Sequence, residues 1–132
     1  MSCPEAVVLW GDGINCEEES AQAASDAGFK ISMLHTNEIH THGAEALLKS
    51  ALLILPGGFS FGDELGSGRL LAHKMRFGFG DAFYRYIDQG GLVLGICNGF
   101  QALVQLGVFG DDVFLMHNAG GHFLSQWVSL EI

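Results

Sequence analysis

Short apolar runs alternate with segments of helix length along this chain, and the alternation predicts an α/β fold with a mostly parallel sheet. Strands are predicted at residues 6–10, 30–35, 51–55 and 92–96. Five helices are predicted. The first lies between a cap at Asn15 and a stop at Gly28, and the second covers residues 44–49. The third and fourth, at residues 63–75 and 81–89, each begin with an aspartate that could cap the helix, and the fifth runs from just after Cys97 to Gly107.

The C-terminal tail has a different pattern. Residues 113–116 and 122–132 both look like strands. In the second, the odd-numbered residues from Phe123 to Glu131 would lie on one face and the even-numbered residues from Leu124 to Leu130 on the other. We expect these two segments to form a short, hairpin-like β extension of the main sheet.

The composition indicates one domain of a soluble protein, covering residues 1–132. A formal charge of −9 argues against nucleic acid or an anionic membrane as the main partner. The three cysteines are an odd number for a disulfide framework, and the first residues lack the pattern of a signal peptide. We therefore expect a cytoplasmic protein that has no membrane segment.

One cysteine lies between two glycines where the fourth predicted strand should turn into a helix. The apolar run at residues 92–94 leads into Gly95-Ile96-Cys97-Asn98-Gly99. A side chain on so tight a turn needs small neighbours, and the helix that follows favours the thiolate form of the sulfur. The motif is typical of a cysteine enzyme that transfers acyl groups, although a buried structural cysteine on a glycine-rich turn remains the alternative.

A second glycine-rich loop, at residues 56–63, follows the third predicted strand. Because the carboxyl ends of parallel strands lie at one edge of the sheet, we expect this loop to lie beside Cys97. Acyl transfer needs N–H groups aimed at the developing oxyanion, and adjacent glycines let the backbone approach a substrate. The backbone amides of Gly58 and Asn98 are the predicted pair. A Pro-Gly-Gly sequence alone is also compatible with an ordinary turn.

Other candidate motifs are weaker. The loop from Gly11 to Cys16 lacks the third glycine of a dinucleotide fingerprint, and the second strand ends without an acidic residue for a ribose, so NAD binding is rejected. Cys16 is assigned a structural or secondary-loop role. His40 and His42 have no recognised metal-ligand spacing, so no metal site is predicted, and a catalytic base cannot be chosen from sequence alone.

Three motifs together resemble the glutaminase component of phosphoribosylformylglycinamidine synthase, a class I glutamine amidotransferase of purine biosynthesis. They are Gly13-Ile14-Asn15-Cys16-Glu17, Pro56-Gly57-Gly58-Phe59-Ser60-Phe61-Gly62-Asp63 and Gly95-Ile96-Cys97-Asn98-Gly99-Phe100-Gln101. The likeness extends over nearly the whole chain. It implies a flavodoxin-like fold with helices on both faces of the sheet.

The resemblance also implies a reaction. Cys97 would attack the side-chain amide of glutamine, release ammonia, and be freed by hydrolysis of a glutamyl thioester. Gly58 and Asn98 would hold the oxyanion, and Gly57, Phe59 and Gln101 would help to bind the substrate. No cofactor is expected in this domain. Ammonia would pass to a synthetase, either a separate subunit or a fused domain, which uses ATP and magnesium.

One part of the expected triad is missing from this sequence. The family completes its triad with a histidine and a glutamate of a later H-x-E motif, and neither His117 nor His122 has a carboxylate two residues on. Without a base, thiolate formation and protonation of the leaving ammonia lose their agent. We therefore expect residues 1–132 to be a partial domain that is weak or inactive by itself.

Two other functions stay open at this point. The first is another cysteine hydrolase or stress protein of related fold, in which Asp12 after the first strand would tune the cysteine; residues 59–63 argue against it. The second is a non-catalytic module that binds a partner. Selective reaction of Cys97 with an electrophilic glutamine analogue would favour the glutaminase.

Overall fold

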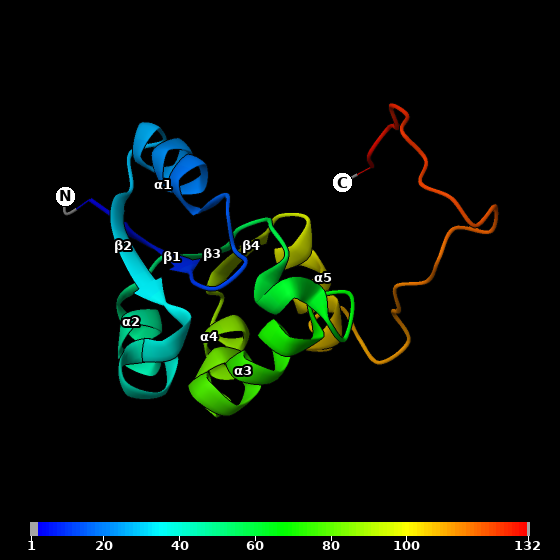
Figure 1. The fold of residues 1–132 in the computed structure, drawn as a ribbon. Helices are drawn as coiled ribbons and strands as arrows, with labels where there is room; N and C mark the ends of the chain where they lie inside the picture. The colour runs from blue at the N-terminus through cyan, green and yellow to red at the C-terminus, as the bar shows by residue number, and fades with distance from the viewer. Residues whose placement is uncertain (1–2, 132) are drawn as a thin grey trace.

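The computed structural model describes residues 3–131, which form a parallel sheet with helices on both faces (Figure 1). The strands are β1 (Glu5–Trp10), β2 (Lys30–His35), β3 (Leu52–Leu55) and β4 (Leu92–Gly95), in the order β2-β1-β3-β4. The helices are α1 (Glu17–Asp26), α2 (Ala44–Lys49), α3 (Arg69–Phe79), α4 (Asp81–Asp88) and α5 (Asn98–Gln105). Short helical turns lie at Thr36–Glu38, Ile39–Gly43 and Ser60–Asp63.

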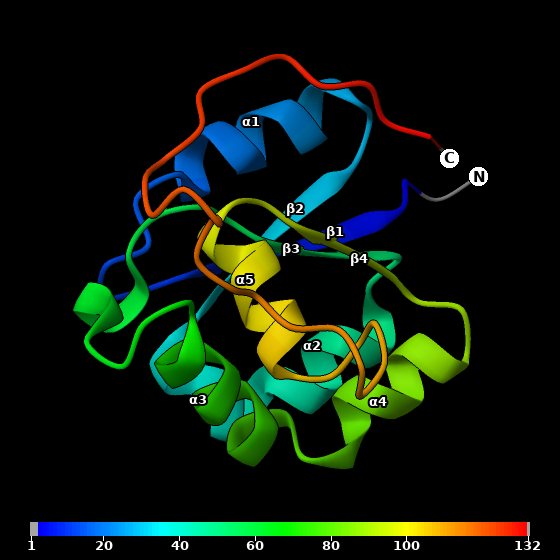
Figure 2. The same cartoon turned by 90° about the vertical axis from the view of Figure 1, so that its right-hand side faces the viewer.

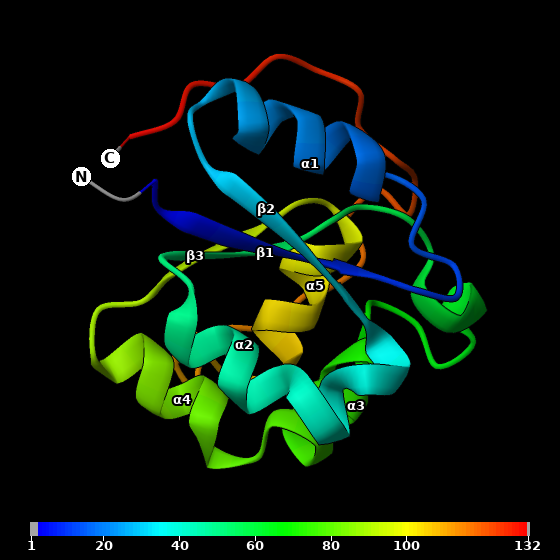
Figure 3. The same ribbon diagram turned by 90° about the vertical axis from the view of Figure 1, so that its left-hand side faces the viewer.

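The two faces of the sheet carry different numbers of helices. Helix α1 lies on one face, and α2, α3, α4 and α5 lie on the other (Figures 2 and 3). Successive side chains of a strand point to opposite faces. In β1, Val7 and Leu9 therefore enter the large core under the four helices, whereas Ala6 and Val8 pack with Ala24 of α1.

The face that carries α1 is only partly covered. Leu92 and Leu94 of β4 pair in register with Leu52 and Ile54 of β3, so they lie on the α1 face. Helix α1 packs over β1 and β2, and Leu92 and Leu94 remain 62% and 47% exposed. Ile96, just beyond the strand, is 39% exposed. The result is an exposed apolar row along the edge strand.

The four predicted strands of the sheet and the fold class are confirmed. Among the helices, the main corrections concern where they begin. The segments Lys30–His35 and Ala44–Lys49 have the predicted bounds. The helix predicted to begin at Asp63 begins at Arg69, because Ser67 and Gly68 have φ of 49° and 70°, outside the helical range. Asn15 and Asp81 do not cap helices: Cys16 and Gly80 occupy those N-cap positions without side-chain cap bonds.

The predicted C-terminal β extension is wrong. Residues 111–131 contain no strand, and they run away from the body of the molecule (Figure 1). Phe123, Trp127 and Leu130 are 86%, 102% and 87% exposed. A strand needs a neighbour to pair its N–H and C=O groups, and no part of residues 3–131 lies alongside this segment as one. Ile132, the last residue of the prediction, is outside the described residues.

None of the helices within residues 3–131 has the length and apolar character that a membrane crossing requires.

Candidate active site

Cys97 lies at the sharp turn that its sequence predicts. Strand β4 ends at Gly95, α5 begins at Asn98, and Cys97 between them has φ 51° and ψ −108°. A left-handed φ at a residue other than glycine costs on the order of 1–3 kcal/mol and clusters at functional sites. The thiol is free and exposed at the N-terminus of α5, where the helix dipole favours a negative charge.

The two glycines beside Cys97 are required by close packing. A Cβ on Gly99 would lie 2.0 Å from the carbonyl oxygen of Leu55 in β3. A Cβ on Gly95 would lie 2.8 Å from the backbone nitrogen of Phe100 in α5. No side chain fits at these distances, so the turn depends on glycine at both positions.

The loop after β3 lies directly against Cys97, as predicted. A Cβ placed on Gly57 would be 3.5 Å from Cys97 Cβ and 3.8 Å from Cys16 Sγ. Ile96 N–H donates to the Leu55 carbonyl at 3.0 Å, which continues the pairing of β3 and β4 up to the turn. The parallel sheet therefore brings the glycine pair and the cysteine to the same edge.

The amides of Gly58 and Asn98 are both free of backbone partners among residues 3–131. Gly58 pairs with Ile14 in an antiparallel bridge whose hydrogen bonds come from the neighbouring residues. In such a pair the N–H of the central residue points away from the partner segment. The Asn98 N–H is the first amide of α5 and has no intrahelical acceptor. The oxyanion role of the two amides remains a prediction.

The loop after β1 braces the glycine loop. Phe59 N–H donates to the Gly13 carbonyl at 2.7 Å, and Phe61 N–H donates to the Asp12 carbonyl at 2.8 Å. Gly13 has φ +80°, and a Cβ there would lie 2.0 Å from the Phe59 carbonyl oxygen. The sequence singled out Cys16 of this loop for a structural or secondary role. The structure shows that Gly13, with its positive φ, lets the loop approach Phe59 closely.

Residues 3–132 match the CobB/CobQ-like glutamine amidotransferase domain. The chain belongs to this family. The phosphoribosylformylglycinamidine synthase subunit PurQ of Dehalococcoides mccartyi is 37% identical over 138 aligned positions, which cover 100% of this chain and 54% of the relative. The same subunit of Methanococcus maripaludis strain C5 is 41% identical over 136 positions, 97% of this chain and 50% of the relative.

A solved structure has the same fold as this glutamine amidotransferase domain. A chain in the structure of PurLQS from Thermotoga maritima matches with a TM-score of 0.73 and 32% identity, over 96% of this chain and 54% of that one. The chain spans about half the length of the curated relatives it matches.

The predicted substrate-binding residues of this family member lie around the turn, and their roles remain predictions. Gly57 lies so near Cys97 that a Cβ added to it would be in van der Waals contact with the cysteine side chain. Phe59 is 67% exposed, with its ring available to a ligand. Gln101, on the first turn of α5, accepts a hydrogen bond from Asn98 Nδ2 at 3.1 Å and lines a cavity of about 710 Å³ together with Arg69 and His117.

No histidine is hydrogen-bonded to the Cys97 thiol in the described part of the chain. His117 and His122 both lie in the exposed tail. Within residues 3–131 no group of three His, Cys, Asp or Glu side chains is placed to hold a metal ion. Asp12, the residue of the alternative cysteine-protein hypothesis, is exposed and contacts the glycine loop through its carbonyl.

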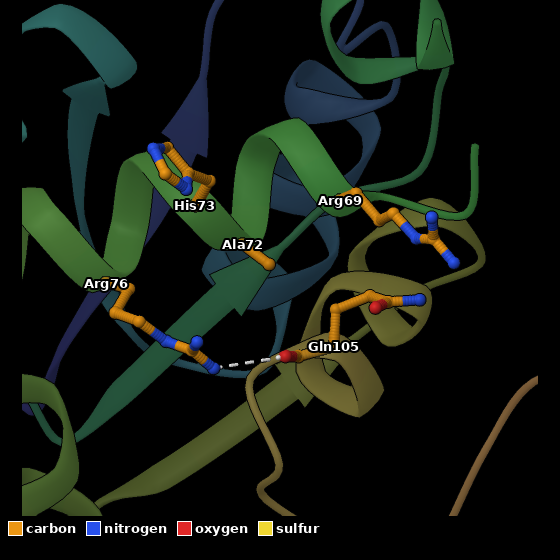
Figure 4. Close-up of a pocket in the computed structure, with 5 residues that line it drawn as sticks. All are labelled: Arg69, Ala72, His73, Arg76 and Gln105. Carbon is orange, nitrogen blue, oxygen red and sulfur yellow. Dashed lines mark hydrogen bonds between the residues drawn. The ribbon is translucent and has the colours of Figure 1, made fainter. Parts of the chain in front are cut away.

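A separate hollow lies between α3 and α5. Figure 4 shows Arg69, His73 and Arg76 of α3 and Gln105 of α5 around it, with Arg76 Nη2 donating to the Gln105 carbonyl at 3.2 Å. Its volume is about 160 Å³. It contains no cysteine or carboxylate, so it offers no nucleophile or acid–base group apart from His73. We place the candidate site at Cys97.

Proposed function

We propose that this domain cleaves the side-chain amide of glutamine through Cys97. The Cys97 sulfur attacks the amide carbon, and the carbonyl oxygen becomes an oxyanion between the N–H groups of Gly58 and Asn98. Collapse of this intermediate breaks the C–N bond and expels ammonia, with the thiol proton ending on the nitrogen. Water then hydrolyses the glutamyl thioester, which gives glutamate and the free thiol.

One observation supports this proposal above the others. The strained, exposed cysteine lies at a strand-to-helix turn against a glycine loop whose amide, like that of Asn98, has no backbone partner among the described residues. A structural cysteine gains nothing from such an arrangement, because its strain of about 1–3 kcal/mol would be uncompensated by burial. A nucleophile needs both the exposure and the nearby donors.

The names of the relatives support a partner and a pathway. Proteins called subunits of phosphoribosylformylglycinamidine synthase are similar over 97% to 100% of this chain. We infer that the ammonia serves a synthetase subunit or domain of that enzyme in purine biosynthesis. ATP and magnesium would bind to the synthetase, this domain would need no cofactor, and the complex would work in the cytoplasm.

Covalent labelling tests the nucleophile without requiring turnover. The protein is treated with 6-diazo-5-oxo-L-norleucine, a diazoketone analogue of glutamine, and the modified residue is located by peptide mass spectrometry. We expect modification of Cys97, loss of labelling in Cys97→Ser, and unchanged labelling in Cys3→Ser, whose thiol lies elsewhere on the surface. A folded protein whose Cys97 stays unmodified would favour the non-catalytic binding module.

Ammonia release tests the expectation of weak activity. The sequence contains no histidine with a carboxylate two residues on, so the usual base of the family is not identified in it. We expect residues 1–132 to release little ammonia from glutamine. Sustained turnover at the rates ordinary for enzymes, roughly 1–1,000 per second, would contradict this expectation and would also show that another residue acts as the base.

A further inference from the structure

The side chain of Asn98 is buried beside the nucleophile. It is 1% exposed, at the first position of α5. Its Oδ1 accepts from Ser60 N–H at 3.1 Å and from Ser60 Oγ at 2.5 Å. Its Nδ2 donates to Asp63 Oδ1 at 3.3 Å and to Gln101 Oε1 at 3.1 Å. A carboxamide has two acceptor sites and two N–H donors, so all of its hydrogen-bonding capacity is used.

The orientation of this amide is determined by its partners. The Ser60 N–H can only donate, so the group facing it must be the carbonyl oxygen of Asn98. The opposite edge of the amide faces a carboxylate oxygen, which accepts. Removing the side chain would leave these buried groups unpaired, which costs about 1–3 kcal/mol for each unsatisfied group.

The loop that Asn98 holds is strained. Phe61, Gly62 and Asp63 have φ of 54°, 67° and 53°, and two of these three residues are not glycine. Each left-handed residue other than glycine costs on the order of 1–3 kcal/mol, so the loop keeps this shape only if its surroundings hold it. Asp63 Oδ1 also accepts from Gly68 N–H at 2.8 Å, which connects the network to the start of α3.

We propose that the Asn98 side chain is a positioning residue that sets the distance between the two oxyanion donors. Ser60 lies two residues after Gly58, and Asn98 directly follows Cys97. The same residue thus supplies one donor through its backbone and holds the loop that carries the other through its side chain. This inference rests on the proposed function, because an oxyanion forms only if Cys97 attacks a carbonyl.

The test compares two reactions of Cys97 that differ in their need for an oxyanion site. Acylation by the γ-(4-nitrophenyl) ester of glutamate passes through a tetrahedral oxyanion, and its leaving group needs no general acid. Alkylation by iodoacetamide is a direct displacement with no oxyanion. Release of 4-nitrophenolate and mass spectrometry give the rates, and Cys97→Ser protein supplies the background.

We expect Asn98→Ala to lower the acylation rate by about 10- to 100-fold, since a displacement of about 1 Å can cost that much. Iodoacetamide alkylation should stay within about 2-fold, because it needs only an accessible thiolate. Ser60→Ala removes one hydroxyl donor and should lower acylation by about 5-fold, equivalent to one hydrogen bond. Asp63→Asn keeps the accepting Oδ1 and should acylate within about 3-fold of wild type, within the cost of a single hydrogen bond.

A matched control and two outcomes decide the result. Gln22→Ala removes an exposed carboxamide of α1 that donates to Asp26 of the same helix, and both reaction rates should be unchanged. If Asn98→Ala or Ser60→Ala lowers the melting temperature but leaves the ratio of acylation to alkylation at its wild-type value, the side chain is merely structural and the inference is wrong.

Should Asn98→Ala fail to fold, the ratio of acylation to alkylation in Ser60→Ala decides the question instead. Wild-type protein that is not acylated at all would instead overturn the proposed function, and this inference with it.

Discussion

Replacing Gly99 by alanine tests whether the turn at Cys97 depends on direct contact between α5 and β3. The new Cβ would lie 2.0 Å from the oxygen and 2.6 Å from the carbon of the Leu55 carbonyl. Both are backbone atoms of a buried strand, so α5 must move away from the sheet. Overpacking of this kind costs about 1–3 kcal/mol. The gain in helix propensity is below about 1 kcal/mol, because Gly99 lies in the first turn.

The expected change in melting temperature follows from chain length. The entropy of unfolding is roughly 2.1 cal/mol/K per residue, so 1 kcal/mol corresponds to roughly 4 °C for 132 residues. Gly99→Ala should therefore melt about 4–12 °C below wild type. Thermal unfolding followed by circular dichroism measures this shift. Acylation of Cys97 by the glutamate ester should fall as well, since the cysteine moves with α5.

Gly57→Ala is the matched control for the steric argument. Its Cβ would lie 3.5 Å from Cys97 Cβ, an ordinary van der Waals contact. The stability should stay within about 0.5 kcal/mol of wild type, or about 2 °C. The methyl group would occupy the space beside Cys97, so we expect the acylation rate to fall by about 10-fold without loss of stability.

Two results would refute this reasoning. A Gly99→Ala protein that melts at the wild-type temperature would mean that α5 is not held against Leu55. A Gly57→Ala protein that loses as much stability as Gly99→Ala would mean that the space beside Cys97 is smaller than the structure indicates.

Two further predictions follow from packing. Gly13→Ala should lower stability by more than about 1 kcal/mol and slow the acylation of Cys97, since its Cβ would lie 2.0 Å from the Phe59 carbonyl oxygen and its φ is +80°; a wild-type melting curve and rate would show that this loop does not brace the site. Leu94→Thr should reduce binding of the dye ANS while stability stays within about 0.5 kcal/mol, because Leu94 is 47% exposed. The control Leu53→Ala, at a fully buried position, should cost about 2–5 kcal/mol in urea unfolding; equal losses at the two leucines would contradict the assignment of the exposed row.

Local sequence was sufficient for most of the secondary structure and for the turn at Cys97. The sequence pattern of residues 30–35 and 44–49 predicted where strand β2 and helix α2 begin and end, because each of these elements is short. The glycines around Cys97 predicted the turn, because steric exclusion by a Cβ is a local property. The rule that strand ends share one sheet edge then brought Gly57 and Gly58 to the cysteine.

Tertiary structure decided the features that depend on partners distant in the chain. The alternation after residue 121 looked like a strand, but backbone groups form a strand only beside another strand, and none lies there within the described residues. Asp63 looked like a helix cap, yet it accepts from Gly68 and Asn98, because a left-handed stretch delays α3 to Arg69. A capping pattern reports which groups a residue can bond, and the fold determines which of them it meets.

The same division holds at the site. The sequence by itself predicted an exposed cysteine on a tight turn between glycines at Cys97, since that follows from the geometry of a few neighbouring residues. Only the fold could show that the side chain of Asn98 would meet Ser60, 38 residues earlier in the chain, and be fully buried there. Hydrogen bonds of this kind join segments that are distant in the chain. The packing of the sheet and helices decides how close such segments lie, and no local sequence pattern predicts that distance.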